Sequence, residues 1–250
     1  MTHPRPDHEA STLYIEVIDA RKSFGKVPVL EQITLSVGRG EIFGLLGPSG
    51  SGKTTLVNLI TGLTAPDQGT VTLLGERMPQ LKLLSKIGYM AQSDALYGEL
   101  SAYDNLTFFA SLYGLHGAAL KHRIVEVAEL VQLSEHLNRP VNQYSGGMKR
   151  RLSLAVSIMH KPEVLVLDEP TVGIDPVLRK TVWAELNRFR REGTAILVTT
   201  HVMDEAEKCD RLAMLRDGRI IAIGSPEQLK LQSQSESMED AFIAFGGGVR

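Results

Sequence analysis

The sequence predicts an α/β fold with a P-loop core, an N-terminal antiparallel β subdomain and an inserted α-helical subdomain. Residues 11–46 alternate apolar and polar side chains between glycine-containing turns, as strands with one buried face do. Residues 42–60 form an apolar run, a glycine-rich loop and a second apolar run, which favours strand, loop and helix. Residues 93–160 have the apolar spacing of helices and separate this half from a second strand-rich half.

We expect one domain over residues 1–250. Within it, residues 11–92 and 161–230 form the core with its β subdomain, residues 93–160 form the helical subdomain, and residues 231–250 form a C-terminal helix and tail. The chain has 250 residues, of which 43% are hydrophobic, so it can bury a sizeable core.

The first turn of the β-rich stretch carries an aromatic residue, Phe24. An aromatic side chain at a turn can stack on an adenine ring, and it can equally be a packing residue. This stretch alone does not decide between the two.

The loop over residues 47–55, GPSGSGKTT, fits G-x-x-x-x-G-K-[ST]. Its glycines let backbone N–H groups point at phosphate oxygens, at the positive end of the following helix. Lys53 would reach the β- and γ-phosphates, and the Thr54 hydroxyl would hold Mg²⁺. A simple surface turn would not explain why strand, loop and helix agree, so the sequence predicts a nucleoside triphosphate site. The expected contacts are Gly47, Pro48, Ser49, Gly50, Ser51, Gly52, Lys53, Thr54 and Thr55.

Beyond the loop, the helix is expected to end at Gly62, and residues 70–74 and 86–91 are expected strands. Gln92 follows the second of these strands. A polar side chain at a strand's end can reach a metal ion or its water.

The helical stretch contains two amphipathic patterns and a third that begins at Ser145. The first starts at a capping-box-like sequence over residues 101–104, and the second runs over residues 120–131. Ser145 is an expected N-cap, and Gly146 and Gly147 leave backbone N–H groups that attract anions. On its own this is a weak signal, since most such sequences are turns. The basic residues 149–151 are expected to form a solvated helix face.

Residues 164–167 are a continuous apolar run, as in a strand buried on both faces. Asp168 and Glu169 follow it, where α/β sheets bind their ligands. Asp168 suits a Mg²⁺ ligand and Glu169 could orient an attacking water, although either could instead cap the next turn. Asp175 before Pro176 suits an N-cap. The next buried strand, over residues 195–199, leads to His201 at the same edge of the sheet.

Residues 211–215 and 219–223 are expected to form a hairpin about Asp217-Gly218, and residues 238–245 a short amphipathic helix. We expect disorder in the final residues GGGVR. Residues 1–10 are polar with two prolines and are not expected to be a signal peptide or an anchor.

The composition excludes several classes of protein. The net charge of −2 provides no basic field for nucleic acid. One cysteine, Cys209, permits no internal disulfide and fits a reducing cytosol. No apolar run approaches about 18 residues, so no membrane span is expected. A GTPase would need an Asn-Lys-x-Asp motif, and the sequence has no Asn-Lys pair.

Taken together, the chain over residues 12–230 resembles the ATP-binding cassette (ABC) ATPases. In family order, residues 47–54 match Walker A, Gln92 the Q-loop, residues 144–148 the signature, residues 164–169 Walker B, residues 171–175 the D-loop and His201 the switch histidine. Phe24 falls where the family places its adenine-stacking aromatic, commonly Tyr. The signature departs from LSGGQ at Tyr144 and Met148, and Thr200 stands where Ser is frequent.

The resemblance implies a RecA-like core and a head-to-tail dimer, with each ATP between Walker A of one subunit and the Ser145-Gly146-Gly147 helix of the other. Glu169 would act on the water, His201 would contact the γ-phosphate, and Asp175 would communicate across the interface. The resemblance implies Mg²⁺ ligands at Thr54, Gln92 and Asp168.

Residues 198–229, together with TVGIDP at 171–176 and MEDAFIAF at 238–245, are similar to exporter-type bacterial ATPases, which work with a separate six-helix membrane subunit. Such a subunit would be received at the surface around residues 89–100, which would place this chain at the cytoplasmic face of the membrane. The resemblance also implies that the second ATPase subunit is another copy of this chain, in a homodimer. The alternative is a soluble ABC ATPase that acts on ribosomes or DNA; those usually carry two cassettes or a long charged coiled coil.

Overall fold

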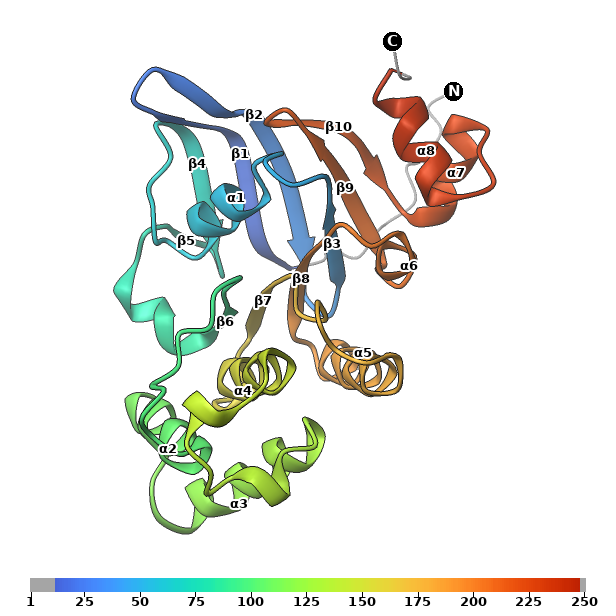
Figure 1. Ribbon diagram of the computed structural model, residues 1–250. Coiled ribbons are helices and arrows are strands. Elements are labelled where there is room, and N and C mark those ends of the chain that lie inside the picture. Colours follow the sequence, from blue (N-terminus) through green and yellow to red (C-terminus); the bar gives the residue numbers. More distant parts are fainter. Residues whose placement is uncertain (1–11, 248–250) are drawn as a thin grey trace, which may run out of the picture.

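The computed structural model describes residues 12–247. The expectations made for residues 1–10 and 248–250 concern residues outside this range. The expectation of disorder is wrong for Gly246, which lies in a turn and whose carbonyl oxygen accepts a hydrogen bond from Arg216 at 2.7 Å. The described chain contains two β-sheets, a helical insert and a C-terminal pair of helices (Figure 1). The insert lies at the opposite end of the molecule from the N-terminal hairpin (Figure 1).

The N-terminal sheet is antiparallel, as expected. Its strand order is β2-β1-β4-β5. The strands are β1 (Leu13–Phe24), β2 (Val27–Gly38), β4 (Gln68–Leu73) and the short β5 (Glu76–Arg77). A 3₁₀ turn, η1 (Leu81–Lys86), leads from this sheet to the core.

The core sheet has the order β10-β9-β3-β8-β7-β6. Neighbouring strands are parallel from β9 to β6, and only the β9–β10 pair is antiparallel. Because parallel strands end at the same edge, the segments that follow β3, β7 and β8 meet there. The strands are β3 (Ile42–Leu46), β6 (Ile87–Met90), β7 (Val164–Asp168), β8 (Ala195–Thr200), β9 (Arg211–Arg216) and β10 (Arg219–Gly224).

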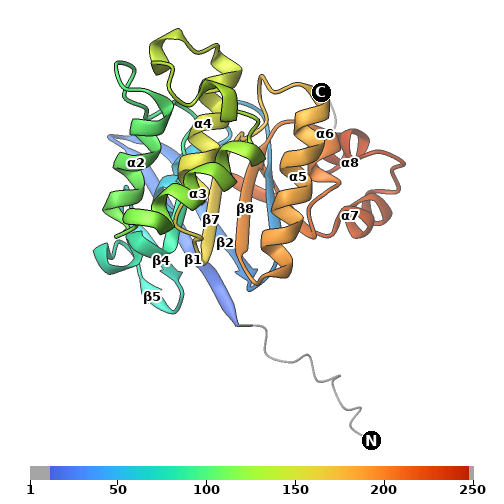
Figure 2. The same cartoon turned by 90° about the horizontal axis from the view of Figure 1, so that it is seen from below.

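Both faces of the core sheet are buried. One face shares an apolar cluster with the N-terminal sheet and with α1 (Lys53–Ile60). The other face packs against the helical insert and α5 (Pro176–Arg191), as Figure 2 shows. Burial on both faces explains why β3, β7 and β8 are continuous apolar runs rather than alternating ones.

The helical insert contains α2 (Ala102–Leu112), α3 (Gly117–Leu130) and α4 (Gly146–Ile158), joined by the 3₁₀ turns η2 (Ser134–His136) and η3 (Val141–Gln143). Ser101 caps α2 by accepting a hydrogen bond from the backbone N–H of Asp104. The second expected apolar pattern is buried along α3 and its end, at Leu120, Ile124, Val127 and Val131. Residues 93–160 are therefore mainly helical, as the sequence predicts.

The C-terminal part contains one helix that the sequence analysis missed. The hairpin about Asp217-Gly218 and helix α8 (Met238–Phe245) form as expected. However, α7 (Pro226–Ser233) crosses the expected boundary after residue 230. Its capping box joins Ser225 and Gln228. Only Pro226 and Leu229 of this helix are buried, so the helix has no long apolar repeat to reveal it.

His160 joins the helical insert to the core. Its ring stacks on Tyr113 at 3.7 Å between centroids, and its Nε2 lies 3.0 Å from the carbonyl oxygen of Ile87. Burial lowers the pKa of His160 from 6.5 to about 4, with a smaller lowering contribution from Arg123. The ring is therefore neutral in the folded protein at pH 7, and Nε2–H donates to Ile87.

Acidification should therefore weaken the fold through His160. Between pH 6.5 and about 4 the unfolded chain binds a proton that the folded chain does not, so stability falls as the pH drops through this window. The full shift corresponds to about 3 kcal/mol, and partial solvent contact reduces this to about 1–2 kcal/mol. Urea unfolding at pH 7.5 and pH 5 should show a smaller loss in His160→Gln than in the wild type. The control is His122→Gln, on the exposed side of α3; an equal loss in all three proteins would contradict the role of His160.

Candidate functional site

The glycine-rich loop connects the end of β3 to the start of α1 (Figure 1). A Cβ added at Gly47 would lie 2.3 Å from the carbonyl oxygen of Leu215 and 2.7 Å from Oγ of Ser51, so no side chain fits there. Gly52, the N-cap of α1, has a φ of 105°, which favours glycine. The loop therefore curls closely over the helix N-terminus, where unpaired backbone N–H groups attract anions.

The side chains of Lys53 and Ser51 make this loop suited to binding an anion. The buried Lys53 ammonium donates to the carbonyl oxygens of Gly47, at 2.7 Å, and Pro48, at 3.0 Å. Burial lowers the pKa of Lys53, and the charges of Glu169 and Asp168 partly oppose this. The buried Ser51 hydroxyl has no hydrogen-bond partner within residues 12–247. A phosphate group would supply acceptors for both side chains, so the loop fits the triphosphate that the sequence predicts.

Two oxygen donors for a divalent cation meet beside the loop. The Thr54 hydroxyl donates to Oδ2 of Asp168 at 3.0 Å, although the two residues are 114 positions apart. The Thr199 hydroxyl donates to the other carboxylate oxygen of Asp168, which is buried at the end of β7. Residues 12–247 contain no cluster of three or more His, Cys, Asp or Glu side chains suited to a metal. This sparse oxygen set fits Mg²⁺, which usually takes one or two protein ligands together with phosphate oxygens and water.

Glu169 and His201 lie together at the same edge of the sheet. The His201 Nδ1 is 3.1 Å from Oε1 of Glu169. Glu169 has a φ of 53°, which is uncommon for a residue other than glycine. Its backbone N–H is held by the carbonyl and hydroxyl oxygens of Thr199, at 3.2 and 3.0 Å. Such a strained conformation, fixed by its surroundings, is typical of functional positions.

Several of the expected site residues line one cavity of about 270 Å³. Gln92 forms part of its wall, and its side chain is exposed. Within the described residues, no hydrogen bond joins Gln92 to Asp168 or Thr54. The chain thus brings the loop, Gln92 and Glu169 to one place. The lining residues are Val29, Ser49, Gly50, Gly52, Lys53, Thr54, Thr55, Gln92 and Glu169.

The signature-like residues lie elsewhere, at the N-terminus of α4. Ser145 caps the helix, its Oγ accepting from the Met148 N–H at 3.3 Å, and Gly146 is exposed. A Cβ at Gly147 would lie 2.9 Å from the carbonyl oxygen of Gly173, so this helix end adjoins the loop before α5. None of residues 145–147 lines the cavity at the glycine-rich loop.

Two further expected residues have local roles in the structure. Asp175 caps α5, its Oδ1 accepting from the N–H groups of Val177 and Leu178 at 3.1 and 3.0 Å. Phe24 is 56% exposed at the end of β1, so its ring is accessible for stacking. The Lys22 ammonium lies 5.8 Å from the centroid of that ring.

The expectation that residues 149–151 form a solvated face is wrong for Arg150. Its side chain is buried and donates to four backbone carbonyl oxygens, those of Ala91 (2.6 Å), Gln92 (3.0 Å), Glu169 (2.7 Å) and Asp168. The physical reason is the orientation of α4, which turns this position toward the core. A signal was available, because Arg150, Leu154 and Ser157 follow the spacing of a buried helical stripe.

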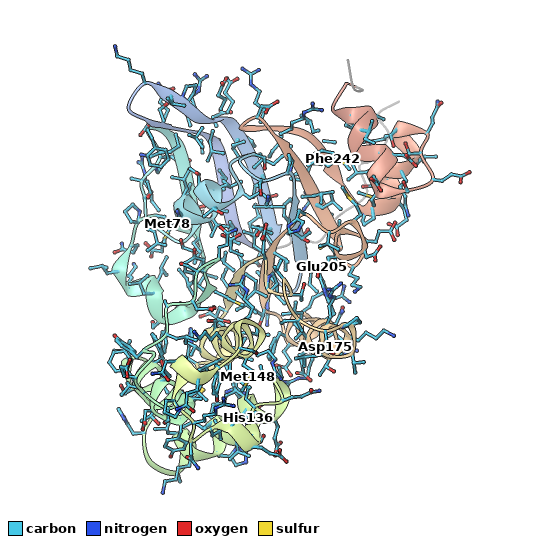
Figure 3. All side chains as sticks on the ribbon, in the orientation of Figure 1. Met78, His136, Met148, Asp175, Glu205 and Phe242 are labelled. Carbon is cyan, nitrogen blue, oxygen red and sulfur yellow. The ribbon has the colours of Figure 1, made fainter. Side chains whose placement is uncertain are left out.

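The sequence analysis also missed the buried acid Glu205 on α6 (Met203–Ala206). Its carboxylate accepts hydrogen bonds from Thr171 and, at 2.8 Å, from Thr200. It thereby ties the segment before His201 to the loop that follows Glu169. Figure 3 shows Glu205 between the core and Asp175. Its position after a strand, on a four-residue helix, gave no periodic signal.

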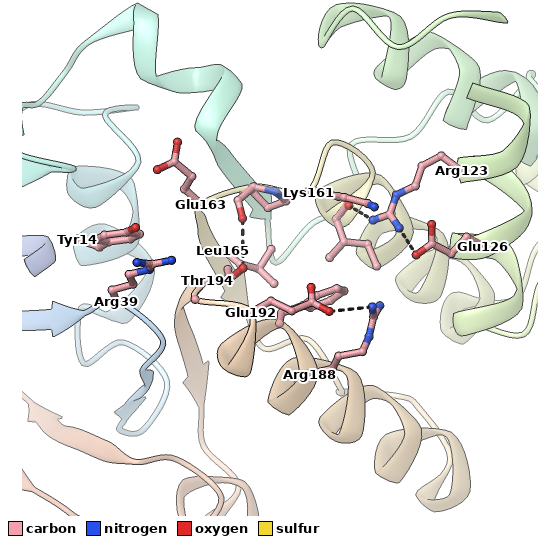
Figure 4. A pocket seen from close by; sticks show the side chains of 14 residues that line it. Tyr14, Arg39, Arg123, Glu126, Lys161, Glu163, Leu165, Arg188, Glu192 and Thr194 are labelled. Atoms are coloured by element: carbon pink, nitrogen blue, oxygen red, sulfur yellow. Dashed lines mark hydrogen bonds and ion pairs between the residues drawn. The ribbon is translucent and has the colours of Figure 1, made fainter. Parts of the chain in front are cut away.

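A larger cavity, of about 540 Å³, lies at the other end of β7 and β8, where Figure 4 labels Glu163, Leu165 and Thr194 in its lining. Its acids are paired with bases, Glu126 with Arg123 and Glu192 with Arg188. Residues of the glycine-rich loop, Gln92 and Glu169 all line the smaller cavity, and Asp168 is hydrogen-bonded to Thr54 in its wall. The smaller cavity is therefore the candidate nucleotide site, although its volume is the lower of the two.

The chain matches the family model described as ABC transporter over residues 30–172 and belongs to that family. It is 41% identical over 236 residues to the probable multidrug ABC transporter ATP-binding protein YbhF of Escherichia coli (strain K12), covering 92% of this chain and 41% of that protein. The chain thus spans about two fifths of the length of that relative.

Two further relatives are export or resistance proteins by name. The chain is 42% identical over 222 residues to the Nod factor export ATP-binding protein I of Sinorhizobium fredii (strain NBRC 101917 / NGR234), covering 88% of this chain and 65% of that protein. It is 39% identical over 218 residues to the linearmycin resistance ATP-binding protein LnrL of Bacillus subtilis (strain 168), covering 86% and 70%.

Solved structures show the same fold. One described as the ATP-binding subunit of an ABC transporter superposes with a TM-score of 0.87 at 28% identity, covering 93% of this chain and 99% of that one. The dimeric ATP-binding cassette MJ0796 bound to ADP and Pi superposes with a TM-score of 0.80 at 25% identity, covering 84% and 98%. The family resemblance and the fold class drawn from the sequence are therefore confirmed.

Proposed function

We propose that this chain is the ATP-binding and ATP-hydrolysing subunit of an ABC exporter and works with a separate transmembrane subunit. The observation that carries the proposal is the convergence of Lys53, the Thr54–Asp168 pair and the Glu169–His201 pair on one edge of the core sheet. Groups suited to phosphate binding, cation binding and water activation are thereby available at one edge of the sheet.

Each of these residues has a chemical task in the proposal. Lys53 and the loop N–H groups hold the phosphates, and Phe24 stacks on the adenine. Thr54, Asp168 and Gln92 would hold Mg²⁺, which would supply positive charge against the phosphate oxygens. Glu169 orients the attacking water and accepts its proton, while His201 positions Glu169 and faces the γ-phosphate.

The placement of α4 supports a head-to-tail dimer. Ser145 and Gly146 are exposed at a helix N-terminus that does not line this chain's own cavity. Such a terminus attracts anions, so it can complete the site of a second subunit. Asp175, in the adjoining loop region, would lie at the same interface. We propose a homodimer, and the dimeric state described for MJ0796 supports this arrangement.

A groove beside Gln92 supports the docking of a membrane subunit. It has a volume of about 300 Å³, is largely apolar, and includes Tyr89, Leu96 and Phe109 between the core and the helical insert. Leu63 and Leu84 are exposed at its border. No helix within residues 12–247 is both long and apolar enough to cross a membrane. In the proposal the chain is held at the cytoplasmic face of the membrane by this contact.

The names of the relatives favour export over action on ribosomes or DNA, since they refer to multidrug transport, Nod factor export and linearmycin resistance. The test is a pull-down of tagged Glu169→Gln protein from its native membranes with MgATP. We expect a stoichiometric polypeptide with several hydrophobic spans of about 20 residues each. Recovery with ribosomes, or without a membrane partner, would favour the soluble alternative. Lys53→Ala provides the matched control, because it should not form the ATP-bound dimer.

A further inference from the structure

Arg150 connects three parts of the molecule that are distant in sequence. It projects from α4, the helix that begins at Ser145. One terminal nitrogen donates to the carbonyl oxygens of Ala91 and Gln92, beyond the end of β6. The other donates to the carbonyl oxygens of Asp168 and Glu169, at the end of β7. The four bonds match the four N–H groups of these two nitrogens.

The Glu169 backbone is therefore held on both sides. Thr199 accepts from its N–H, and Arg150 donates to its carbonyl oxygen and to the preceding one. These bonds fix a φ of 53°, which is not the conformation that a glutamate would adopt freely. The direction of the Glu169 carboxylate depends on this backbone, because the side chain starts from it.

We propose that Arg150 is a positioning residue that couples the α4 helix to Gln92 and Glu169, so that Glu169 is aligned for hydrolysis only when α4 is correctly placed. The proposal rests on the proposed ATPase function. Arg150 touches neither the glycine-rich loop nor Phe24 in any described hydrogen bond, so its loss should affect turnover more than nucleotide affinity. Lysine cannot replace it fully, because a single ammonium cannot reach two pairs of carbonyl groups in the fixed geometry of a guanidinium.

Arg151 provides a matched control on the same helix. It also donates to two backbone carbonyl oxygens, those of Val131 and Gln132, both at 3.1 Å. These bonds stay within the helical insert and do not reach the core. A general loss of helix anchoring should therefore appear in both Arg150→Gln and Arg151→Gln, whereas a loss of alignment should appear only in Arg150→Gln.

The kinetic test measures ATPase turnover of the full chain for Arg150→Gln, Arg150→Lys and Arg151→Gln. We expect kcat of Arg150→Gln to fall about tenfold or more, because small misplacement of a catalytic group has effects of this size. KM should change less than about threefold, Arg150→Lys should recover part of kcat, and Arg151→Gln should stay within about twofold of the wild type. Equal losses of kcat in Arg150→Gln and Arg151→Gln, or normal turnover in Arg150→Gln, would overturn the proposal.

A second test needs no nucleotide. Hydrogen exchange of peptides that cover residues 91–93 and 168–170 should accelerate in Arg150→Gln, while a peptide over the glycine-rich loop should not change. Arg151→Gln should leave all three unchanged. If the wild type neither binds nor hydrolyses MgATP, the proposed function fails, and this exchange pattern still decides whether Arg150 holds Gln92 and Glu169. Unchanged exchange at both segments would exclude the positioning role.

Discussion

Glu169→Gln is expected to retain MgATP binding and to hydrolyse ATP about 10²–10³ times more slowly than the wild type, since a general base contributes effects of this order. The amide has nearly the same shape as the carboxylate, so its oxygen can still face His201. In the wild type, Nδ1 of His201 lies 3.1 Å from Oε1 of Glu169. It cannot accept a proton from water. The measurement is phosphate release under single-turnover conditions, together with nucleotide affinity by calorimetry.

The same variant should accumulate an ATP-bound dimer, because the γ-phosphate that joins the two subunits is not removed. Sedimentation velocity with and without MgATP measures this. Glu163→Gln is the matched control: it lies just before the same strand at the opposite end, where it pairs with Lys86 at 2.9 Å. Full-rate hydrolysis in Glu169→Gln would show that another group activates the water.

Most of the fold could be predicted because its signals are local. The continuous apolar runs of β3, β7 and β8 follow from burial on both faces, and Asp217-Gly218 specifies its own hairpin. The missed helix α7 shows where this reasoning ends. Its start was readable from the Ser225 and Gln228 capping box, but with two buried residues it lacks the repeat that usually identifies a helix.

The site could be predicted in part for the same reason. Lys53 and Asp168 stand in short motifs whose chemistry the sequence carries directly. Arg150 stands in no such motif. Its role depends on the carbonyl groups of two segments, one at least 58 and the other at least 18 positions away, which only the packed structure brings together. Thr199 and Glu205 act in the same way, through hydrogen bonds to Glu169 and Thr171, which are distant in sequence. The helical spacing of Arg150 was a signal that it is buried, but no sequence pattern could show which carbonyl groups it binds.

Lys53→Ala is expected to weaken MgATP binding about 10- to 150-fold, because hydrogen bonds to charged groups contribute roughly 1.5–3 kcal/mol. The substitution removes the ammonium that would meet the phosphates, and it also removes the donor that spans the Gly47 and Pro48 carbonyl oxygens at the start of the loop. The first loss acts on the ligand-bound state. The second also acts on the free loop, whose start still lies close against the carbonyl oxygen of Leu215 at Gly47.

Thermal unfolding separates this loss from damage to the fold. At a concentration near 100 times the wild-type Kd, MgATP should stabilise the wild type by about 2.7 kcal/mol and a variant that binds 50-fold more weakly by only about 0.6 kcal/mol. Without nucleotide the two proteins should unfold at similar temperatures, because Lys53 is a buried charge whose burial disfavours the charged form. Lys180→Ala, on the exposed side of α5, should keep the full ligand shift. Unchanged MgATP affinity in Lys53→Ala would mean that the glycine-rich loop does not bind the triphosphate through this lysine.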